Sequence, residues 1–243
     1  MLNRLLSVVF LFLSLTSCGS KYKIGGTSSV TSLDGKKLFL KTLQNGAWVS
    51  IDSAEVIHGL FTMNGPVDSV MMVTLYMDDE SIMPLVLESG NITISIDNTQ
   101  MSAKGTPLNN ALYEFVDKKN AMDLKIEDLE RKEARMVMDG ADLADIHEQL
   151  AKESEALVSE MNIYVKQFIS DNYENVLGPS VFMMLCSNLP YPVMTPQIED
   201  IMKDAPDTFK NNKMVKEFIS KAHENMQLLE ERRRMEQNAS MHP

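Results

Sequence analysis

The 243-residue sequence has little cysteine, since Cys18 and Cys186 are its only two. Dithiol–disulfide exchange needs a second, resolving cysteine beside the first, and no Cys-x-x-Cys pair is present. A glycine-rich phosphate loop, a serine-nucleophile elbow and a zinc motif are also missing. We therefore predict that the protein is not an enzyme.

Positive charge is scarce as well. The chain has 23 Lys and Arg against 34 Asp and Glu, which gives a net charge of -11. Sorted by position, residues 18–105 carry -3 and residues 106–243 carry -9. An acidic surface repels phosphate backbones and anionic headgroups, so we expect no nucleic acid partner. The hydrophobic content of 44% is ordinary for a packed core.

Residues 1–17 have the features of an export signal. Arg4 is the charged segment, residues 5–15 are apolar, and the small residues Thr16 and Ser17 precede Cys18. Eleven apolar residues are too few to span a bilayer. The order Leu15-Thr16-Ser17-Cys18 resembles a bacterial lipobox, which implies cleavage before Cys18 and lipidation of its thiol. The alternative is an ordinary cleaved signal with an incidental cysteine.

A lipidated Cys18 anchors a protein to a membrane without spanning it, because several acyl chains on one cysteine hold firmly. Gly19-Ser20-Lys21 follows Cys18, and not the acidic cluster that often marks lipoproteins exported to the outside. We therefore expect a cell-envelope, outer-membrane lipoprotein that faces the periplasm.

Residues 18–105 have the features of a β-domain. Nine of the eleven glycines lie before residue 106, and Asp34-Gly35 and Asn45-Gly46 are strong hairpin signals. The second turn predicts that Thr42 pairs with Val49 and Leu40 with Ile51 on the core face. The opposite face carries Lys41, Ser50 and Asp52. Phe39, Leu43 and Trp48 are left on it, either to be covered by another layer or exposed. Further strand signals lie at residues 60–63, 70–76, 83–87 and 92–96.

About eight strands with hairpin connections predict an antiparallel β-sandwich or partly open barrel. The helices expected after it make the fold class α+β.

Residues 106–236 are expected to form a helical domain. Thr106 can cap a helix with its hydroxyl, and Pro107 suits the first helical position. Apolar residues recur at helical spacing on both sides of a break at Asp139-Gly140, which predicts an antiparallel helix hairpin over residues 106–172. Its tip, residues 127–153, is heavily charged. We interpret it as a solvated face; the alternative is an acidic helical arm that docks a protein partner.

Shorter helices are expected over residues 179–236. Gly178-Pro179 starts an apolar helix over residues 180–188, which is expected to be buried because it is hydrophobic almost all round. Thr195-Pro196 repeats the cap-then-proline start. A last helix begins near Asn212, and Arg232-Arg233-Arg234 complements the dipole at its end. Residues 237–243 are expected to form a frayed tail.

Several segments of the first half resemble a known domain family. They are Tyr22-Lys23-Ile24-Gly25-Gly26, Pro84-Leu85-Val86-Leu87-Glu88-Ser89-Gly90 and Gly105-Thr106-Pro107-Leu108-Asn109. They are similar to the uncharacterised N-terminal β-domain that precedes thioredoxin-like modules in bacterial lipoprotein thiol-disulfide oxidoreductases. The resemblance covers roughly residues 22–115, and it implies a fold but no catalytic residue. Because helices follow here, we expect the thioredoxin module to be absent.

The remaining candidate side chains favour structural roles. Cys186 lies in an apolar run without a basic neighbour, which predicts a buried inert thiol; a reactive nucleophile is the alternative. The four histidines show no metal spacing, and they are His58, His147, His223 and His242. Most of the nineteen methionines fall on apolar faces, whereas Met235, Met241 and His242 form one grouping that could hold Cu(I). We predict no cofactor and no metal site.

These observations favour a non-enzymatic cell-envelope lipoprotein. In this hypothesis the β-domain positions an acidic helical arm as a protein-interaction or substrate-holding module. The alternatives are an accessory to envelope thiol-redox enzymes, an enzyme whose site assembles only in three dimensions, and a Cu(I)-binding protein.

The anchor can be tested by replacing Cys18. We expect Cys18→Ala to release the protein into the soluble periplasm or to leave it unprocessed, because alanine offers no thiol for lipidation. Fractionation of cells by ultracentrifugation, followed by detection of the protein, measures the change. A variant that stays in the membrane fraction with the mobility of the processed wild type would contradict a lipid anchor at Cys18.

Overall fold

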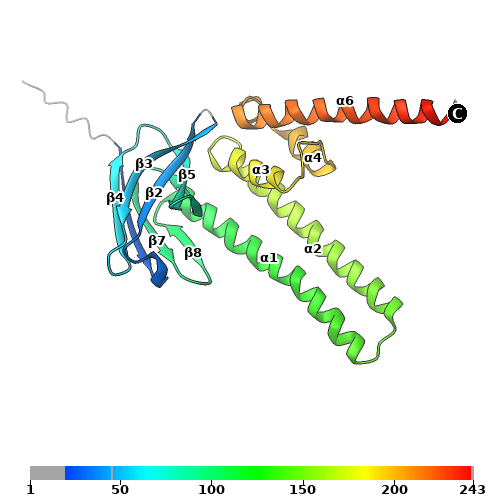
Figure 1. The fold of residues 1–243 in the computed structure, drawn as a ribbon, viewed down its shortest axis with the longest axis horizontal. Coiled ribbons are helices and arrows are strands. Elements are labelled where there is room, and N and C mark those ends of the chain that lie inside the picture. The colour runs from blue at the N-terminus through cyan, green and yellow to red at the C-terminus, as the bar shows by residue number, and fades with distance from the viewer. Residues whose placement is uncertain (1–19, 45, 242–243) are drawn as a thin grey trace, which may run out of the picture.

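The computed structural model describes residues 20–241 apart from residue 45. These residues form two packed β-sheets followed by helices (Figure 1), which confirms the α+β class. The signal peptide predicted at residues 1–17 and the lipidation site Cys18 lie outside the described residues. No helix within the described part is long and apolar enough to cross a membrane.

The β-domain contains eight strands, as predicted, in two four-stranded sheets. One sheet has the order β4-β1-β7-β8 and the other the order β3-β2-β5-β6. The sheets are not closed into a barrel. The strands are β1 (Lys21–Ser28), β2 (Lys37–Gln44), β3 (Ala47–Glu55), β4 (Leu60–Pro66), β5 (Met71–Met77), β6 (Glu80–Leu87), β7 (Gly90–Ile96) and β8 (Met101–Lys104), with a short 3-10 turn η1 (Thr31–Leu33) after β1.

The predicted antiparallel sandwich is confirmed, and it contains one parallel strand pair that was not predicted. Strand β1 lies between β4 and β7 and runs parallel to β7, with Tyr22 opposite Gly90. The other five pairs are antiparallel. Turn residues reveal hairpins between neighbouring strands, whereas β1 and β7 are separated by the five strands β2 to β6. No local sequence signal therefore predicts whether β1 and β7 run parallel or antiparallel.

The β2–β3 hairpin follows the predicted register only near its turn. Thr42 pairs with Val49 as expected, but Leu40 pairs with Asp52 and not with Ile51, because the register shifts between Leu40 and Lys41. A bulge of this kind adds one residue to one strand and re-aims the side chains beyond it. The predicted core positions Val49 and Ile51 are both exposed, and the shift accounts for Ile51 alone, because Val49 keeps its predicted partner.

The same register shift brings the half-buried Asp52 opposite Leu40, although it was predicted on the other face of the hairpin. The Tyr22 hydroxyl donates a 2.7 Å hydrogen bond to Asp52 Oδ2, across the gap between the two sheets. Burial and then this hydrogen bond raise the pKa of Tyr22 well above its ordinary value. The pair supplies a polar link between the sheets at the edge of an otherwise apolar core.

The helical part consists of a long hairpin and a compact group of shorter helices (Figure 1). Residues 237–241, expected to be a tail, belong to the last helix. The helices are α1 (Pro107–Met138), α2 (Leu143–Asp171), α3 (Leu177–Ser187), α4 (Pro196–Asp204), α5 (Asp207–Lys210) and α6 (Lys213–Met241).

Two hydrophobic cores hold the chain together. The sandwich core lies between the sheets and contains fully buried side chains such as Ile24, Leu40 and Leu85. The second core joins α1 and α2 to the shorter helices and is rich in phenylalanine, with Phe182 and Phe209 in edge-to-face contact at 5.6 Å between ring centres. Val116 and Phe168 pack against both cores, so the two parts are continuous.

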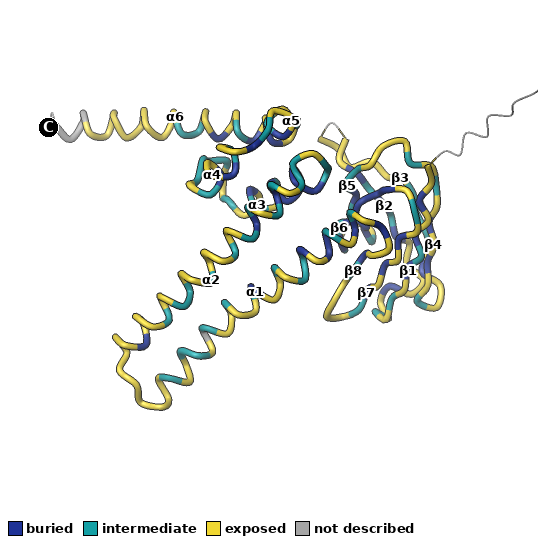
Figure 2. Tube along the Cα trace, turned by 180° about the vertical axis from the view of Figure 1, so that it is seen from behind, coloured by how far each residue is buried: buried dark blue, intermediate teal, exposed yellow. Residues whose placement is uncertain are grey.

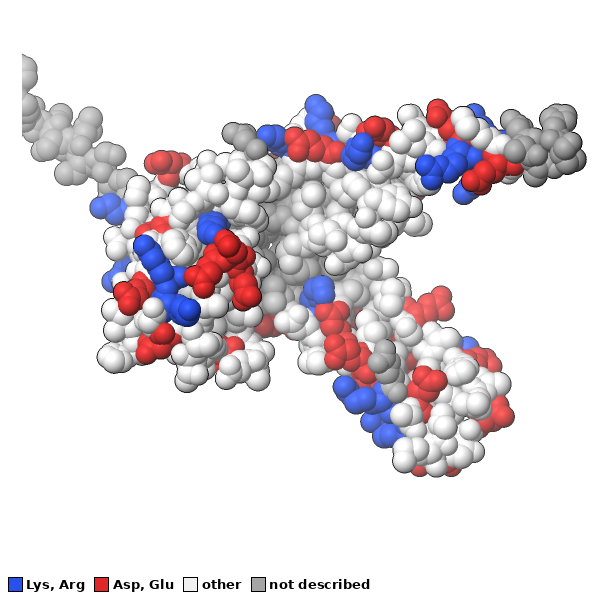
Figure 3. Space-filling view, viewed as in Figure 1, with Lys and Arg blue, Asp and Glu red and all other residues white. Residues whose placement is uncertain are grey.

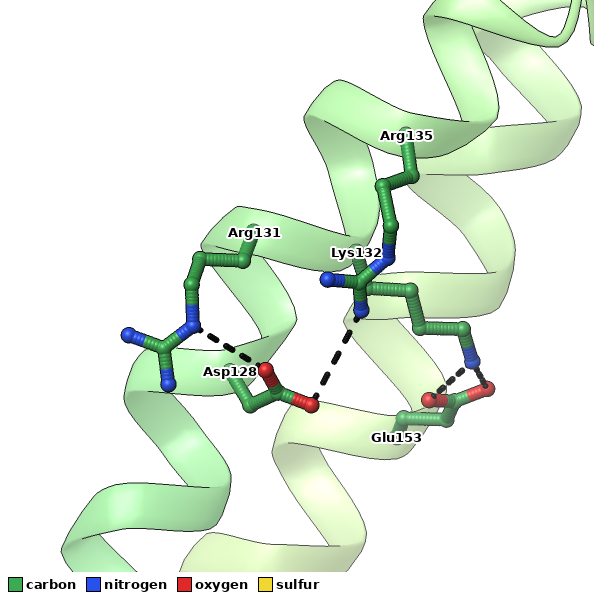
Figure 4. A network of polar contacts seen from close by, with 5 residues as sticks. All are labelled: Asp128, Arg131, Lys132, Arg135 and Glu153. Carbon is green, nitrogen blue, oxygen red and sulfur yellow. Dashed lines mark hydrogen bonds and ion pairs between the residues drawn. The ribbon is translucent and has the colours of Figure 1, made fainter.

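The α1–α2 hairpin extends away from both cores, and its far half is largely exposed (Figures 1 and 2). Charged side chains of its two helices pair with one another (Figure 4). Lys132 Nζ lies 2.6 Å from Glu153 Oε1 across the hairpin, and Arg131 Nε lies 3.1 Å from Asp128 Oδ1 within α1. Exposed pairs of this kind contribute little stability each.

The start of α1 is capped by a different residue from the one predicted. The Thr106 side chain makes no capping hydrogen bond, because its hydroxyl oxygen accepts a 2.9 Å bond from Asn109 Nδ2. Instead, Glu88 Oε1 accepts the backbone N–H groups of Leu108 at 2.8 Å and Asn109 at 3.1 Å. A carboxylate at this place also suits the positive end of the helix dipole.

Asn109 joins α1 to strand β6, which is an edge strand of its sheet. Its side chain is fully buried, accepts from the Val86 N–H at 2.9 Å and donates to the Val86 carbonyl at 2.7 Å. The Tyr113 hydroxyl donates to the Pro84 carbonyl at 2.8 Å, one turn further along α1. We call Glu88, Asn109 and their backbone partners the edge clamp, since they do for β6 what a further strand would do.

The edge clamp predicts a large cost for Asn109→Ala. The substitution leaves the Val86 N–H and carbonyl buried without partners, so we expect a loss of about 3 kcal/mol in the free energy of unfolding. Asn110→Ala is the matched control, because Asn110 Oδ1 accepts only the Gly105 N–H in an exposed bond, and we expect about 1 kcal/mol. Urea unfolding followed by circular dichroism measures both. Equal losses would contradict the role assigned to Asn109.

Candidate ligand-binding cleft

A cleft of about 650 Å³ lies where the β-domain meets the shorter helices. One wall comes from the end of the β2–β3 hairpin and from β5, and the other from α3 and the beginning of α6. We call it the interdomain cleft. Its lining includes Leu43, Trp48, Val70, Met72, Met183, Met184 and Met214.

The β-domain wall of the cleft is exposed because the β2–β3 hairpin extends beyond the neighbouring strand β5. Strand β2 pairs with β5 only from Leu38 to Lys41, so the opposed residues Leu43 and Trp48 lie beyond the paired part of the sheet. Leu43 is 52% exposed and Trp48 is 51% exposed. The Trp48 ring leans on Tyr76, with 5.3 Å between ring centres. This exposure agrees with the sequence analysis, which placed Leu43 and Trp48 on the face opposite the core and left them either covered by another layer or exposed.

The helical wall is formed by one side of α3. Residues Leu177 to Phe182 of this helix are buried, which confirms the prediction for its first half. Met184, however, is 38% exposed, and Met214 at the start of α6 is exposed to the same extent. The prediction that the whole helix is buried is therefore wrong. Alternating burial within an apolar helix is typical of a helix that presents one face to a ligand or partner.

The interdomain cleft has the chemistry of an apolar binding site. None of the described residues that line it is charged, and its polar groups are hydroxyls and one amide, from Thr42, Thr74, Ser180, Ser187 and Asn212. Binding pockets of this volume are mostly apolar, with a few polar groups that fix orientation. Methionine side chains are flexible and polarizable, so they fit differently shaped apolar groups. The lining thus suits an apolar ligand of variable shape.

A second cavity of about 450 Å³ lies between α1, α2 and α3. Its floor includes Phe115, Val165 and Val181, and its rim carries the ion pair between Lys119 Nζ and Asp123 Oδ2 at 2.6 Å. Met184 and Ser187 line both cavities. The outer side of α3 therefore lies between two hollows, one toward the β-domain and one toward the hairpin.

Cys186 is buried on the inner side of α3, as predicted. Burial raises the pKa of its thiol to about 12, because an apolar environment disfavours the thiolate. The thiolate is the reactive form. The position of Cys186 thus favours the structural interpretation of this residue.

The structure does not bring the histidines together. His58 lies in the turn before β4 and His223 on α6, while His147 Nε2 lies 3.2 Å from Glu133 Oε1 on the hairpin. Among the described residues no group of three His, Cys, Asp or Glu side chains could hold a metal ion. Met235 is exposed on α6. The side chains of Met241 and His242 lie outside the described residues, so the Cu(I) alternative stays a prediction.

The acidic helical arm satisfies much of its charge internally. In addition to the pairs of Figure 4, Lys152 Nζ lies 2.6 Å from Glu148 Oε1. The hydrogen bond from Lys132 holds the pKa of Glu153 below its usual value. These contacts favour a solvated face, and docking of a protein partner at the arm stays a prediction.

Comparison with known proteins gives a family match for the β-domain and the start of α1 only. Residues 22–112 match the family model described as "Domain of unknown function (DUF4369)", which confirms the expected uncharacterised N-terminal β-domain. The match ends within α1, so it includes the edge clamp. The described residues beyond it form helices and no thioredoxin module. No curated protein is significantly similar to the chain.

Among solved structures, the solution structure of the CBM25-1 of beta/alpha-amylase from Paenibacillus polymyxa is similar over 37% of this chain and 96% of its own. The sequence identity is 11% and the TM-score is 0.26. A similarity of this extent carries no argument about fold or function.

The burial of Cys186 predicts a silent thiol. In a Cys18→Ser variant, we expect the single remaining thiol to resist a disulfide reagent at pH 8, because a group with a pKa of about 12 forms very little thiolate there. In urea the thiol should react at the rate of an unfolded cysteine, whose pKa is about 8.5. Absorbance of the released chromophore measures both rates. A fast reaction in the folded protein would show that Cys186 is an accessible nucleophile.

Proposed function

We propose that the protein is a non-enzymatic, lipid-anchored protein of the cell envelope that holds an apolar segment of another polypeptide in the interdomain cleft. The observation that carries the proposal is the exposed apolar lining of the cleft. Trp48, Leu43, Met184 and Met214 together line about 650 Å³ of space, with no charged residue among the described lining.

The composition of the walls favours a polypeptide over a ligand of fixed shape. Flexible methionines on the helical wall accommodate different apolar side chains, as at other promiscuous binding surfaces. The Ser187 hydroxyl donates to the Met184 carbonyl and Asn212 Oδ1 accepts the Met214 N–H. The Ser187 oxygen as an acceptor and the Asn212 NH2 group as a donor remain for a peptide backbone. Strand β3 adds an unpaired sheet edge beside the cleft, with Val49 and Ile51 exposed on it. Extended segments bind at edges of this kind.

The surface around the cleft agrees with this role. Figure 3 shows an uncharged area between the β-domain and α6, while Lys, Arg, Asp and Glu gather on the β-domain, on α6 and on the hairpin. Monomeric soluble domains seldom expose a large contiguous apolar area unless it binds something. The charged side chains on the hairpin and on α6 favour contact with water. The uncharged area between them is available for contact with a polypeptide.

The predicted anchor would place the β-domain at the membrane. Strand β1 begins at Lys21, only three residues after Cys18, so a lipid on Cys18 would hold the β-domain close to the bilayer surface. A tether of this length allows the β-domain to rotate, but it keeps the β-domain within a short distance of the bilayer. The localisation to the outer membrane, facing the periplasm, belongs to this proposal.

Among the alternatives, docking of a partner at the acidic helical arm is less favoured than holding in the cleft, because charges of the arm pair with one another. A role as accessory to envelope thiol-redox enzymes stays an alternative, with the match of residues 22–112 to an uncharacterised domain as its only support. An enzyme with a site assembled in three dimensions would need converging acid and base groups, and the described lining of the interdomain cleft offers none.

Trp48 is the only tryptophan of the chain and lines the cleft, so its fluorescence reports binding directly. We expect a peptide of about ten residues that alternates leucine and serine to shift Trp48 emission to shorter wavelength, because the indole leaves water. An all-serine peptide should leave it unchanged. Met184→Ser and Met214→Ser should each weaken binding about fivefold through lost apolar contact.

Met138→Ser is the matched control for these substitutions. Met138 is also an exposed methionine at a helix end, but it lies at the tip of the hairpin and does not line the cleft. We expect the Met138→Ser variant to bind the leucine-containing peptide with the affinity of the wild type. An unchanged Trp48 emission with the leucine peptide, or equal weakening by all three substitutions, would contradict the proposed site.

A further inference from the structure

The second half of α6 leaves the body of the protein. Ala222 is the last buried residue of the described chain, and the Asn225 amide donates a 2.8 Å hydrogen bond to the Pro192 carbonyl just after it. Residues 227–237 are exposed without exception. Figures 1 and 2 show this part of α6 extending beyond every other element. Isolated helical turns have marginal stability in water. A partner that packs on this projecting part of α6 would therefore stabilise it.

One face of this projecting segment has a distinctive order of residues. Leu228, Glu231, Arg232 and Met235 follow one another at spacings of three, one and three, which places them on one side of an α-helix. This side is turned by roughly 120° from Val215, Phe218 and Ala222, the residues that α6 buries in the body. We call it the α6 seam. The body therefore leaves the seam open.

The α6 seam is complementary to itself. If a second copy lies antiparallel on it, with the twofold axis between residues 231 and 232, Leu228 faces Met235 of the second copy and Glu231 faces Arg232 of the second copy. The symmetry repeats both contacts, as an isologous interface requires. We propose that the α6 seam joins two copies of this chain as an antiparallel helix pair.

The state of the seam charges agrees with an intermolecular role. No ion pair among the described residues includes Glu231 or Arg232, although both signs meet on this part of α6 in Figure 3. The hairpin differs, since its charges pair within the chain (Figure 4). Exposed Leu228 and Met235 at the two ends of the seam supply apolar contact on either side of the central charges.

The seam is short, because residues 228 and 235 lie roughly 10 Å apart along the helix. It is much smaller than the interfaces of permanent dimers, so the dimer forms at high protein concentration and dissociates on dilution. This association is independent of the interdomain cleft, which lies at the other end of α6.

Charge exchange tests the proposal. In the full chain purified in detergent, sedimentation across a concentration series should show a dimer. Glu231→Arg and Arg232→Glu should each weaken it at least about tenfold, because symmetry turns two attractions into two repulsions. The double exchange E231R/R232E should restore the dimer, and so should a mixture of the two single variants, which pair with each other.

Two variants on the opposite side of the helix control for a general effect of charge. Glu230 and Arg233 lie roughly 150° from the seam, so Glu230→Arg and Arg233→Glu should leave the dimer unchanged. Circular dichroism checks that every variant keeps its helix content. A wild type that stays monomeric throughout the series, controls that weaken the dimer as much as the seam variants, or a double exchange that fails to restore it would each overturn the proposal.

Discussion

The hydrogen bonds of Asn109 to Val86 are the interaction on which the architecture depends. A strand edge that helices cover must find partners for its backbone groups, because a buried unpaired N–H or carbonyl costs about 1–3 kcal/mol. Strand β6 finds them in one side-chain amide that reproduces the donor and acceptor of a neighbouring strand. The same residue gives its own N–H to Glu88. A single position therefore ends the sheet and begins the helix.

This junction determines where everything after it lies. Because α1 is bonded to β6 at Asn109 and again at Tyr113, its direction is fixed within its first two turns. Phe115 then meets Tyr164 and Phe168 of the returning helix, with ring centres 5.5 and 4.4 Å apart. The returning α2 delivers the chain to α3 beside the β2–β3 hairpin. The interdomain cleft is thus a consequence of the edge clamp, several elements later.

Much of the fold was open to prediction because its causes are local. Alternating apolar residues predicted the strands, Pro107 and Thr195-Pro196 predicted helix starts, and Asp139-Gly140 predicted the hairpin turn. Thr195 caps α4 through its hydroxyl as expected. The parallel β1–β7 pair, the register shift after Leu40 and the capping by Glu88 were not predictable in this way. The parallel pair and the capping depend on residues that are distant in the sequence, and the register shift lies inside a hairpin whose turn residues do not reveal it.

The site was predictable only in part, for the same reason. The sequence indicated that Leu43 and Trp48 lacked a cover, since they lay opposite the core face of their hairpin. It could not indicate that Met184 and Met214 would face them, because an apolar helix alone does not show which of its sides is buried. A uniformly apolar α3 reads as a core helix until the position of the β-domain beside it is known.

Charge is distributed unevenly over the molecule. With a net charge of -11, the protein attracts cationic and repels anionic polypeptides over a distance of about 10 Å. The described lining of the interdomain cleft has no charge with which to continue that selection, so the final contact depends on apolar area and shape. Electrostatic attraction of this kind mainly raises the rate of encounter, whereas buried apolar contact sets how long a complex lasts. In the proposed holding function, selection would be broad at long range, and the cleft would retain the segments that can fill it.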